Sequence, residues 1–315
     1  MASLKQALML FFPLLAFSST VSSNSEDAGI AVYWGQNMEE GVKEGTLQET
    51  CQSGSYKYVT LASLTVFGCN RTPSWDFDSH CSGWDCLTEL APEVEFCQNQ
   101  DILVFLSIGG MDDYSLCSPE DAKEVANFLW QVFLSGQQIP DHGQGLALNG
   151  IVFDIEGKRS NLYYDNLVTE LNAFRTQKQF YLTAATGCTI PDYLLDKAIK
   201  TGYFDFISVK LYENSTCQFD GSANNLLNSW DIWTRYVPSN AKVFLGIITN
   251  PSDNGYIPPE ILISILQYLK LSPNYAGINE WNRYSDVQSN PSYSDQVLPY
   301  VSKNVLRYVT EKSWL

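Results

Sequence analysis

The chain has 315 residues, 13% of them aromatic, and a formal net charge of −16 at pH 7. An acidic surface repels the phosphate backbone of nucleic acids and anionic lipid head groups. This argues against nucleic acid or membrane partners and favours a neutral or cationic one. The same charge is equally compatible with a role in solubility alone. The length suffices for one large barrel domain or for two small domains.

The first residues have the pattern of a secretory signal peptide. Lys5 supplies a positive charge, Ala7–Phe17 form an apolar run, and small residues precede Asn24. We therefore expect a signal peptide over residues 1–23 and a mature domain over residues 24–315, secreted to the extracellular space or to the vacuole. No later stretch approaches the roughly 18 continuous apolar residues of a membrane-spanning helix.

Eight cysteines in an exported chain indicate disulfides rather than a metal site. The two histidines, His80 and His142, cannot form the usual zinc sites, and we expect neither a metal nor a cofactor. Asn70 and Asn214 each begin an N-x-Thr sequon and are candidate glycosylation sites. The cysteines are Cys51, Cys69, Cys81, Cys86, Cys97, Cys117, Cys188 and Cys217.

Short β-rich runs alternate with amphipathic segments along the chain. Most runs are almost continuously apolar, as expected for strands of a parallel sheet that is covered on both faces. Eight such strands favour a single (β/α)8 barrel over an open, doubly wound sheet, because no Gly-rich dinucleotide loop follows the first strand. The predicted strands are Gly29–Tyr33, Tyr58–Leu64, Ile102–Ile108, Gly150–Asp154, Phe180–Ala185, Phe206–Lys210, Lys242–Ile247 and Gly277–Glu280. The clearest helices are Ala122–Phe133, Leu162–Phe174 and Pro258–Leu269.

Two carboxylates lie at the end of the fourth predicted strand. Asp154 and Glu156 are two residues apart, so in an extended chain they point to the same face, which in a barrel is the interior. Close carboxylates raise one another's pKa, which suits one of them to proton donation. Solvated acids at an ordinary strand end are the alternative. Active sites of such barrels lie at the C-terminal strand ends, so we expect a ligand-binding cleft there.

The segment Leu148–Gly157 resembles the DGxDxDxE signature of glycoside hydrolase family 18. From about Ala28 to Val305 the chain resembles the plant class III chitinases of that family. The other matching segments, in chain order, are Gly29–Asn37, Leu106–Gly110, Phe204–Phe206 followed by Tyr212, and Ala276–Ile278 followed by Trp281.

The resemblance implies a retaining reaction without a protein nucleophile. Glu156 would protonate the leaving oxygen while the acetamido carbonyl of the substrate attacks the anomeric carbon. Asp154 and the Tyr212 hydroxyl would orient that acetamido group. Trp281 would stack under the sugar. The residues expected to line the substrate subsite are Tyr33, Gln36, Lys210 and Trp281.

The resemblance also implies three disulfides, which leave two cysteines over. Cys69 and Cys117 follow the second and third strands, which are neighbours in a barrel, and we expect them to form a fourth bridge at the rim of the cleft. The three implied pairs are Cys51–Cys97, Cys81–Cys86 and Cys188–Cys217.

The chain departs from the family pattern at several positions. Val152 and Asn149 stand in place of the inner and the first aspartate of the signature. The inner aspartate normally shares a proton with the middle one, so Asp154 lacks this partner. Ser63 stands where an aromatic wall is usual, and Met111 falls at or beside a glycine position.

Lys210 replaces a neutral glutamine two residues before Tyr212. We expect its ammonium group to pair with Asp154 or Glu156, to stabilise the ionised carboxylates and so to lower their pKa. An acid that is already deprotonated cannot donate a proton. Together with the other departures, this predicts that hydrolysis is weak or absent.

Three functions remain open. The first is a chitinase-like protein that binds chitin or chito-oligosaccharide without hydrolysing it, as seed lectins of this fold do. The second is an active acidic endochitinase. The third is an inhibitor of another glycosidase, because the pattern Lys210–Glu213 also resembles the xylanase-inhibitor branch of the family.

Overall fold

The computed structural model describes residues 28–36, 44–78, 80–110, 113–157 and 160–303. The expected signal peptide, residues 1–23, and Met111 lie outside the described residues. Within them, no helix is long and apolar enough to cross a membrane.

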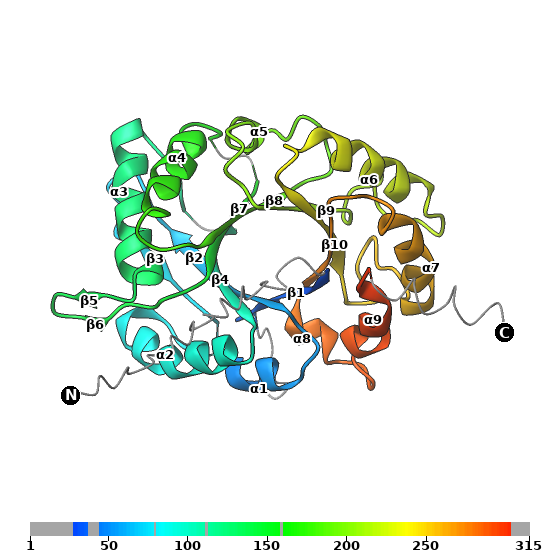
Figure 1. Ribbon diagram of the computed structural model, residues 1–315, viewed down its shortest axis with the longest axis horizontal. Helices are drawn as coiled ribbons and strands as arrows, with labels where there is room; N and C mark the ends of the chain where they lie inside the picture. The colour runs from blue at the N-terminus through cyan, green and yellow to red at the C-terminus, as the bar shows by residue number, and fades with distance from the viewer. Residues whose placement is uncertain (1–27, 37–43, 79, 111–112, 158–159, 304–315) are drawn as a thin grey trace, which may run out of the picture.

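Eight parallel strands form a closed barrel at the centre of the molecule (Figure 1). The first strand, β1, closes it by pairing with β2 on one side and with the last strand, β11, on the other. The predicted (β/α)8 fold is therefore confirmed, and each predicted strand lies within two residues of an observed one. The barrel strands are β1 (Gly29–Trp34), β2 (Tyr58–Val66), β4 (Leu103–Gly110), β7 (Gly150–Ile155), β8 (Tyr181–Thr186), β9 (Phe206–Lys210), β10 (Lys242–Ile248) and β11 (Tyr275–Trp281).

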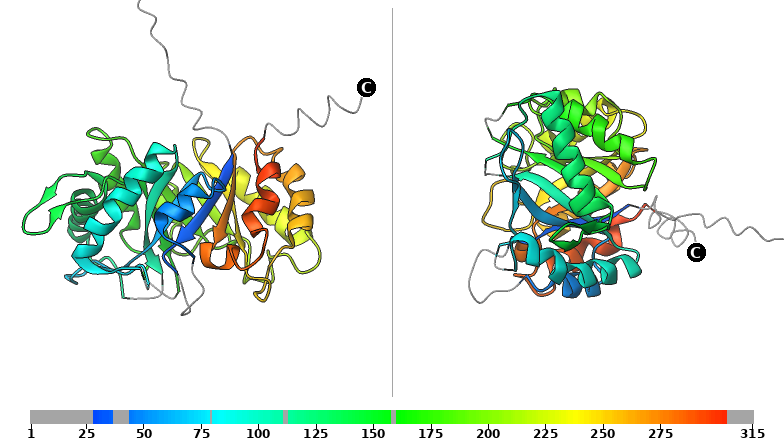
Figure 2. Two further views of the ribbon diagram at one scale, coloured as in Figure 1. Left: turned by 90° about the horizontal axis from the view of Figure 1, so that it is seen from below. Right: turned by 90° about the vertical axis from the view of Figure 1, so that its left-hand side faces the viewer.

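Helices surround the barrel (Figure 2), and their ends follow local capping rules. The Ser118 side chain accepts from the backbone N–H of Asp121, and Pro119 occupies the first helical position of α3. The helix predicted over Ala122–Phe133 is α3 continued by one π-helical segment, η1. The helices are α1 (Leu47–Gln52), α2 (Gly83–Asn99), α3 (Pro119–Leu129), η1 (Trp130–Leu134), α4 (Tyr164–Phe174), α5 (Asp196–Ile199), α6 (Asn224–Tyr236), α7 (Pro259–Leu269), α8 (Arg283–Asp286) and α9 (Tyr293–Val301).

Three very short strands were not expected from the sequence. The strand β3 (Ser74–Trp75) pairs antiparallel with β2. A separate hairpin joins β5 (Gln138–Ile139) to β6 (Gly143–Gln144). A strand of two residues shows no hydrophobic alternation, so the sequence contains no signal for it.

Aromatic rings fill the barrel interior below its C-terminal end. The ring of Tyr58 lies 5.3 Å from that of Phe244 and 5.6 Å from that of Phe206, both in edge-on geometry, and Phe105 lies 6.0 Å away. Burying each such side chain contributes roughly 1.5–3 kcal/mol. These rings fill the lower interior, so the cavity described below lies above them, toward the C-terminal strand ends.

All eight cysteines are paired as expected from the sequence, in the four bridges Cys51–Cys97, Cys69–Cys117, Cys81–Cys86 and Cys188–Cys217. Cys69 and Cys117 connect the loops that follow β2 and β4. The carboxylate of Asp121 accepts the backbone N–H of both cysteines at 2.8 Å. The two loops are therefore joined by a covalent bond and by hydrogen bonds to one helix terminus.

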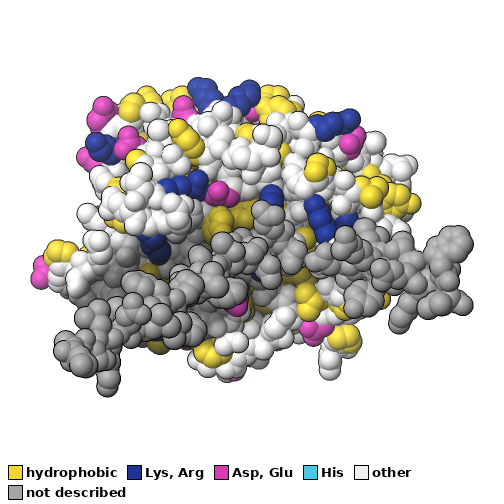
Figure 3. Space-filling model, viewed as in Figure 1, with side chains coloured by type: hydrophobic (Ala, Val, Ile, Leu, Met, Phe, Trp, Pro, Cys, Tyr) yellow, Lys and Arg dark blue, Asp and Glu magenta, His cyan; other side chains and the backbone are white. Residues whose placement is uncertain are grey.

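Figure 3 shows the face of the molecule that is turned to the viewer in Figure 1. Where this face is not covered by the grey residues, basic and acidic side chains are interspersed.

Candidate functional site

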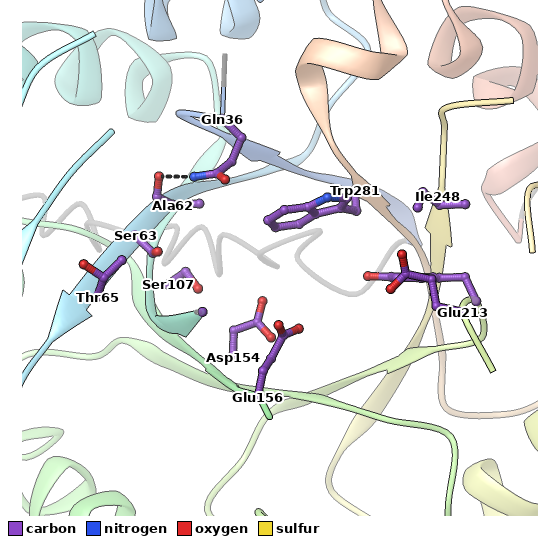
Figure 4. A pocket seen from close by; sticks show the side chains of 12 residues that line it. Gln36, Ala62, Ser63, Thr65, Ser107, Asp154, Glu156, Glu213, Ile248 and Trp281 are labelled. Atoms are coloured by element: carbon purple, nitrogen blue, oxygen red, sulfur yellow. Dashed lines mark hydrogen bonds between the residues drawn. The ribbon is translucent and has the colours of Figure 1, made fainter. Parts of the chain in front are cut away.

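A cavity of about 350 Å³ lies at the C-terminal ends of the barrel strands. Figure 4 shows Asp154 and Glu156 side by side, with their carboxylates directed toward the space beside Trp281. Both acids come from the end of β7, and Trp281 ends β11. The lining residues are Gln36, Ala62, Ser63, Thr65, Ser107, Gly110, Asp154, Glu156, Tyr212, Glu213, Ile248 and Trp281. The expected cleft is therefore present where the barrel geometry predicts it.

Lys210, the last residue of β9, links the two acids. Its ammonium group donates one hydrogen bond to Asp154 Oδ1 and one to Glu156 Oε1. The Lys210 and Asp154 side chains are only 16% and 6% exposed, so water screens this contact weakly. The pairing expected from the sequence is present, and it involves both carboxylates rather than one.

The expected fall in the pKa of the acid is wrong for Glu156. Burial, and next the neighbouring carboxylate of Asp154, raise the pKa of Glu156 above its ordinary value, and the ammonium group of Lys210 offsets this only in part. Burial alone would lower the pKa of Lys210, but Asp154, Tyr212 and Glu156 together raise it above its ordinary value. Lys210 therefore remains charged, and Glu156 still takes up a proton at mildly acidic pH more readily than an exposed glutamate does.

Tyr212 and Trp281 take the places expected of them on the cavity wall. Burial and the nearby carboxylate of Asp154 raise the pKa of Tyr212, although Lys210 opposes them, so its hydroxyl keeps its proton. Tyr33 does not line the cavity. Its ring is buried and meets that of Trp281 edge-on at 5.0 Å. Val32 pairs with Glu280, so Tyr33 lies level with Trp281 in the barrel. Burial, and next the carboxylate of Asp154, raise the pKa of Tyr33 well above its ordinary value.

Gln36 forms part of the opposite wall. Its side-chain amide donates to the carbonyl oxygens of Gly35 and Ala62 at 2.9 and 3.0 Å. The buried carboxylate of Glu44 accepts the backbone N–H groups of Gly35 and Gln36, both at 3.0 Å, and lies 2.9 Å from His80 Nε2. Glu44 and His80 thus fix the backbone that carries Gln36. Neither residue belongs to a pattern that the sequence alone made visible.

The hydroxyl group of Tyr114 is a second contact that sequence reasoning missed. It accepts the backbone N–H of Glu156 at 2.8 Å and donates to the carbonyl oxygen of Gly110 at 2.9 Å. The Tyr114 ring stacks on Phe67 at 5.1 Å. Since Tyr114 precedes the Cys69–Cys117 bridge by three residues, the cross-linked rim loops also hold the backbone of the acid.

The departures from the family signature lie at different depths. Val152 faces the barrel interior two residues below Asp154, beside Thr183 and Ser107 on the neighbouring strands. Asn149 lies at the other end of β7, where its side-chain oxygen accepts the backbone N–H of Val104 at 2.9 Å. Asn149 therefore ties strands together, far from the cavity, whereas Val152 lies directly beneath it. Ser63 lines the cavity.

Several lining residues were not predicted. Thr65, Ile248 and Glu213 lie at or just beyond the C-terminal end of a barrel strand, and Ser107 lies three residues before the end of β4. The rule that places active sites at these ends would have found them, once the strand ends were known to within a residue.

Both candidate glycosylation sites lie in loops at strand ends. Asn70 has a positive φ of 59° in the loop after β2 and is exposed. In the loop after β9, Asn214 Oδ1 accepts the Thr216 hydroxyl at 2.7 Å. Within the described part of the chain, the one grouping of metal-binding side-chain types is Cys69, Cys117 and Asp121, and its two sulfur atoms are joined in a disulfide.

Comparison with known proteins agrees with this geometry. The sequence model of the glycosyl hydrolases family 18 matches residues 29–256. An acidic endochitinase of Cicer arietinum is 41% identical over 288 residues, which cover 89% of this chain and 95% of that protein.

Two solved structures are also similar. One is a xylanase and alpha-amylase inhibitor protein of Scadoxus multiflorus, with 34% identity, a TM-score of 0.78, and coverage of 86% of this chain and 98% of that one. The other is the tamarind chitinase-like lectin, with 33% identity, a TM-score of 0.76, and coverage of 86% and 99%. The fold, the cavity and these matches lead to one conclusion: the chain belongs to family 18 of the glycosyl hydrolases and is a chitinase-like protein.

Proposed function

We propose that this is a secreted chitinase-like protein that binds chitin or related N-acetylglucosamine oligosaccharides in the cavity and hydrolyses them weakly or not at all. The observation that carries the proposal is the contact of the Lys210 ammonium group with both carboxylates. Secretion follows from the signal peptide expected over residues 1–23, and cleavage would leave Asn24 at the N-terminus.

Substrate-assisted hydrolysis requires each of these two acids to perform one role. Glu156 must give a proton to the glycosidic oxygen, and Asp154 must hold the acetamido group in place for attack. Lys210 occupies one oxygen of each carboxylate, and Asp154 has Val152 beneath it instead of a second acid. Moving the ammonium group aside would separate a poorly screened ion pair, which adds to the barrier for the reaction.

Binding does not need those two steps. Trp281 offers an aromatic surface for the apolar face of a sugar ring, and the hydroxyl groups of Ser63 and Ser107 reach the cavity from the other side (Figure 4). The Tyr212 hydroxyl remains available as a donor at neutral pH because its pKa is raised.

The test compares binding with turnover of N-acetylchitotetraose. Calorimetry should detect binding to the natural protein and to Glu156→Gln with similar affinity, and Trp281→Ala should lose it. Product analysis should find little or no cleavage by the natural protein. Cleavage at the rate of an active family member, abolished by Glu156→Gln, would contradict the proposal.

An active endochitinase is the second candidate, and the raised pKa of Glu156 favours it. The relative from Cicer arietinum carries the name of an acidic endochitinase. If this reading holds, turnover should increase as pH falls toward the pKa of Glu156 and should vanish in Glu156→Gln.

Inhibition of a glycosidase is the third candidate, favoured by the likeness to the Scadoxus multiflorus inhibitor. Titration against a xylanase and an alpha-amylase decides it. A stoichiometric loss of either activity would establish inhibition, and full retention of both would exclude it for the enzymes used.

A further inference from the structure

Acidic side chains reach the cavity from two directions. Asp154 and Glu156 enter from the end of β7, and Glu213 enters from the loop after β9. None of the described residues that line the cavity is a lysine, an arginine or a histidine. Lys210, which the sequence placed in the subsite, is not among the lining residues, and its ammonium group is engaged by the first two acids. Among the described lining residues, a ligand in the cavity therefore meets carboxylates and no cationic side chain.

Glu213 is the acid that remains available to a ligand. Figure 4 places it on the side of Ile248, across the cavity from Ser63 and Thr65. Its side chain is exposed, and no described residue forms a hydrogen bond or an ion pair with its carboxylate. Its backbone N–H donates to the carbonyl oxygen of Asn254 at 3.1 Å, which fixes the loop that carries it.

A close contact of backbones holds this loop in place. Glu213 has a positive φ of 54°, and Gly255 packs against Tyr212 so tightly that a Cβ on Gly255 would lie 2.9 Å from Tyr212 Cα. Contacts between these two loops thus hold the backbone of Glu213 beside the cavity.

The sugars of chitin and of deacetylated chitin differ only in the group on their nitrogen. Stacking on Trp281 uses the ring face, which is the same in both, so it does not discriminate between them. An acetamido group presents one neutral N–H donor and a carbonyl oxygen that needs a donor, and it carries no charge. A free amine, once protonated, presents only donors, and an ionised carboxylate accepts only. The Glu213 side of the cavity therefore matches an ammonium group better than an acetamido group.

We propose that Glu213 makes the cavity selective for partially deacetylated chitin, that is, for oligosaccharides with a glucosamine unit beside an N-acetylglucosamine unit. This inference rests on the proposed function, because it assumes that β-1,4-linked N-acetylglucosamine occupies the cavity. It assigns the choice of sugar to a residue that the reaction itself does not use.

The test measures the affinity of two tetrasaccharides by calorimetry at pH 5.5. One is N-acetylchitotetraose, and the other is the same tetramer with one free amine. The natural protein should bind the second about two- to fivefold more tightly at low salt, the range expected of a partly exposed ion pair. The preference should disappear in Glu213→Gln and at high salt, because salt screens exposed charges.

Glu124→Gln is the matched control, since Glu124 is an exposed acid on α3, outside the cavity. The Glu124→Gln variant should keep the preference for the tetramer with one free amine. Binding of both tetramers without a preference, or a preference that survives Glu213→Gln, would overturn the inference and leave the proposed function intact. Binding of the free-amine tetramer alone would overturn the proposed function and support the role of Glu213. If neither tetramer binds, both proposals fail.

Discussion

The ammonium group of Lys210 neutralises one of the two carboxylates at the end of β7 and leaves the pair with a single net negative charge. Two carboxylic acids that share one site can hold a single proton between them, as in aspartic proteases. Here a fixed cation takes the place of that proton. A fixed cation stabilises the same charges but cannot be passed to a leaving group.

Restoring the family residues should therefore restore the chemistry. In Val152→Asp with Lys210→Gln, the inner aspartate would again lie two residues below Asp154, beside Thr183, whose buried hydroxyl has no partner among the described residues. A positioned general acid contributes typically 10²–10⁴-fold, so turnover of N-acetylchitotetraose should rise by about that factor.

The control for this prediction is a third change, Glu156→Gln, on the rebuilt background, which should remove the gain. A double variant that unfolds at the same temperature as the natural protein and binds the tetramer, yet shows no faster turnover, would contradict the role given to Lys210 and Val152. The remaining differences in the cavity wall, such as Ser63, would then be the next candidates for the loss of activity that we propose.

At the scale of single residues, the sequence predicted which residues belong to the site better than how deeply each of them is buried. The two acids, Tyr212 and Trp281 follow from motif and strand register, and the cavity contains them all. Tyr33 lies level with Trp281, but it is buried and is not among the residues that line the cavity, because alternation along a strand says which face a side chain takes and not what covers it. The fall in the pKa of Glu156 was wrong because burial, which the sequence does not show, outweighs the charge of Lys210.

Among the elements, the loops after β2 and β4 form a cross-linked rim beside the cavity. The bridge Cys69–Cys117 spans 48 residues, whereas Cys81–Cys86 spans only 5. A cross-link that closes a longer loop removes more entropy from the unfolded chain. The rim bridge is thus expected to be the more stabilising of the two.

The variant Cys69→Ser with Cys117→Ser should lose about 2–4 kcal/mol in the free energy of unfolding by urea. The matched variant Cys81→Ser with Cys86→Ser should lose less. Equal losses in the two variants would show that native contacts, rather than loop closure, determine the contribution of these bridges.

The eight barrel strands were all predicted, because continuous apolar runs between amphipathic segments are a strong signal. The short elements were not. The two residues of β3 and the hairpin of β5 and β6 depend on contacts with distant residues, such as the stacking of His142 on Trp84 at 3.9 Å. Contacts of this kind are set by the folded chain as a whole and leave no local pattern.

For the whole molecule, the pH dependence of stability is expected to depend strongly on Glu280. This side chain points outward from β11 into the layer of α8 and α9, is fully buried, and neither carboxylate oxygen has a partner among the described residues. Burial, followed by the negative charge of Asp286, raises the pKa of Glu280 well above its ordinary value. Arg283 opposes this shift in part, and Asp295 adds to it. Tyr56 and Tyr293 also face this carboxyl group.

A raised pKa in the folded state means that the folded chain binds this proton more tightly than the unfolded chain does. The contribution to stability is therefore fully present below the ordinary glutamate pKa and is lost as pH rises toward the raised one. Glu280→Leu should stabilise the protein at pH 8 by about 1–3 kcal/mol, the cost of an unpaired buried polar group. It should also narrow the difference in Tm between pH 5 and pH 8.

Glu280→Gln separates the two causes, because glutamine cannot ionise but still buries polar atoms. It should narrow the pH dependence without the full gain in stability. If the natural protein and both variants show the same difference in Tm between pH 5 and pH 8, the ionisation of Glu280 does not contribute to it.

The pairing of β1 with β11 has a consequence for how the protein is made. Gly29 lies opposite Gly277, so one edge of the first strand has no partner until nearly all of the chain has been synthesised. At about 5–20 residues per second, that delay lasts roughly 10–50 s. During this time β1 and β2 can pair with each other, but the barrel cannot close. During synthesis, a chain of this topology therefore has an open apolar strand edge, and we expect chaperones to be needed to keep that edge from aggregating.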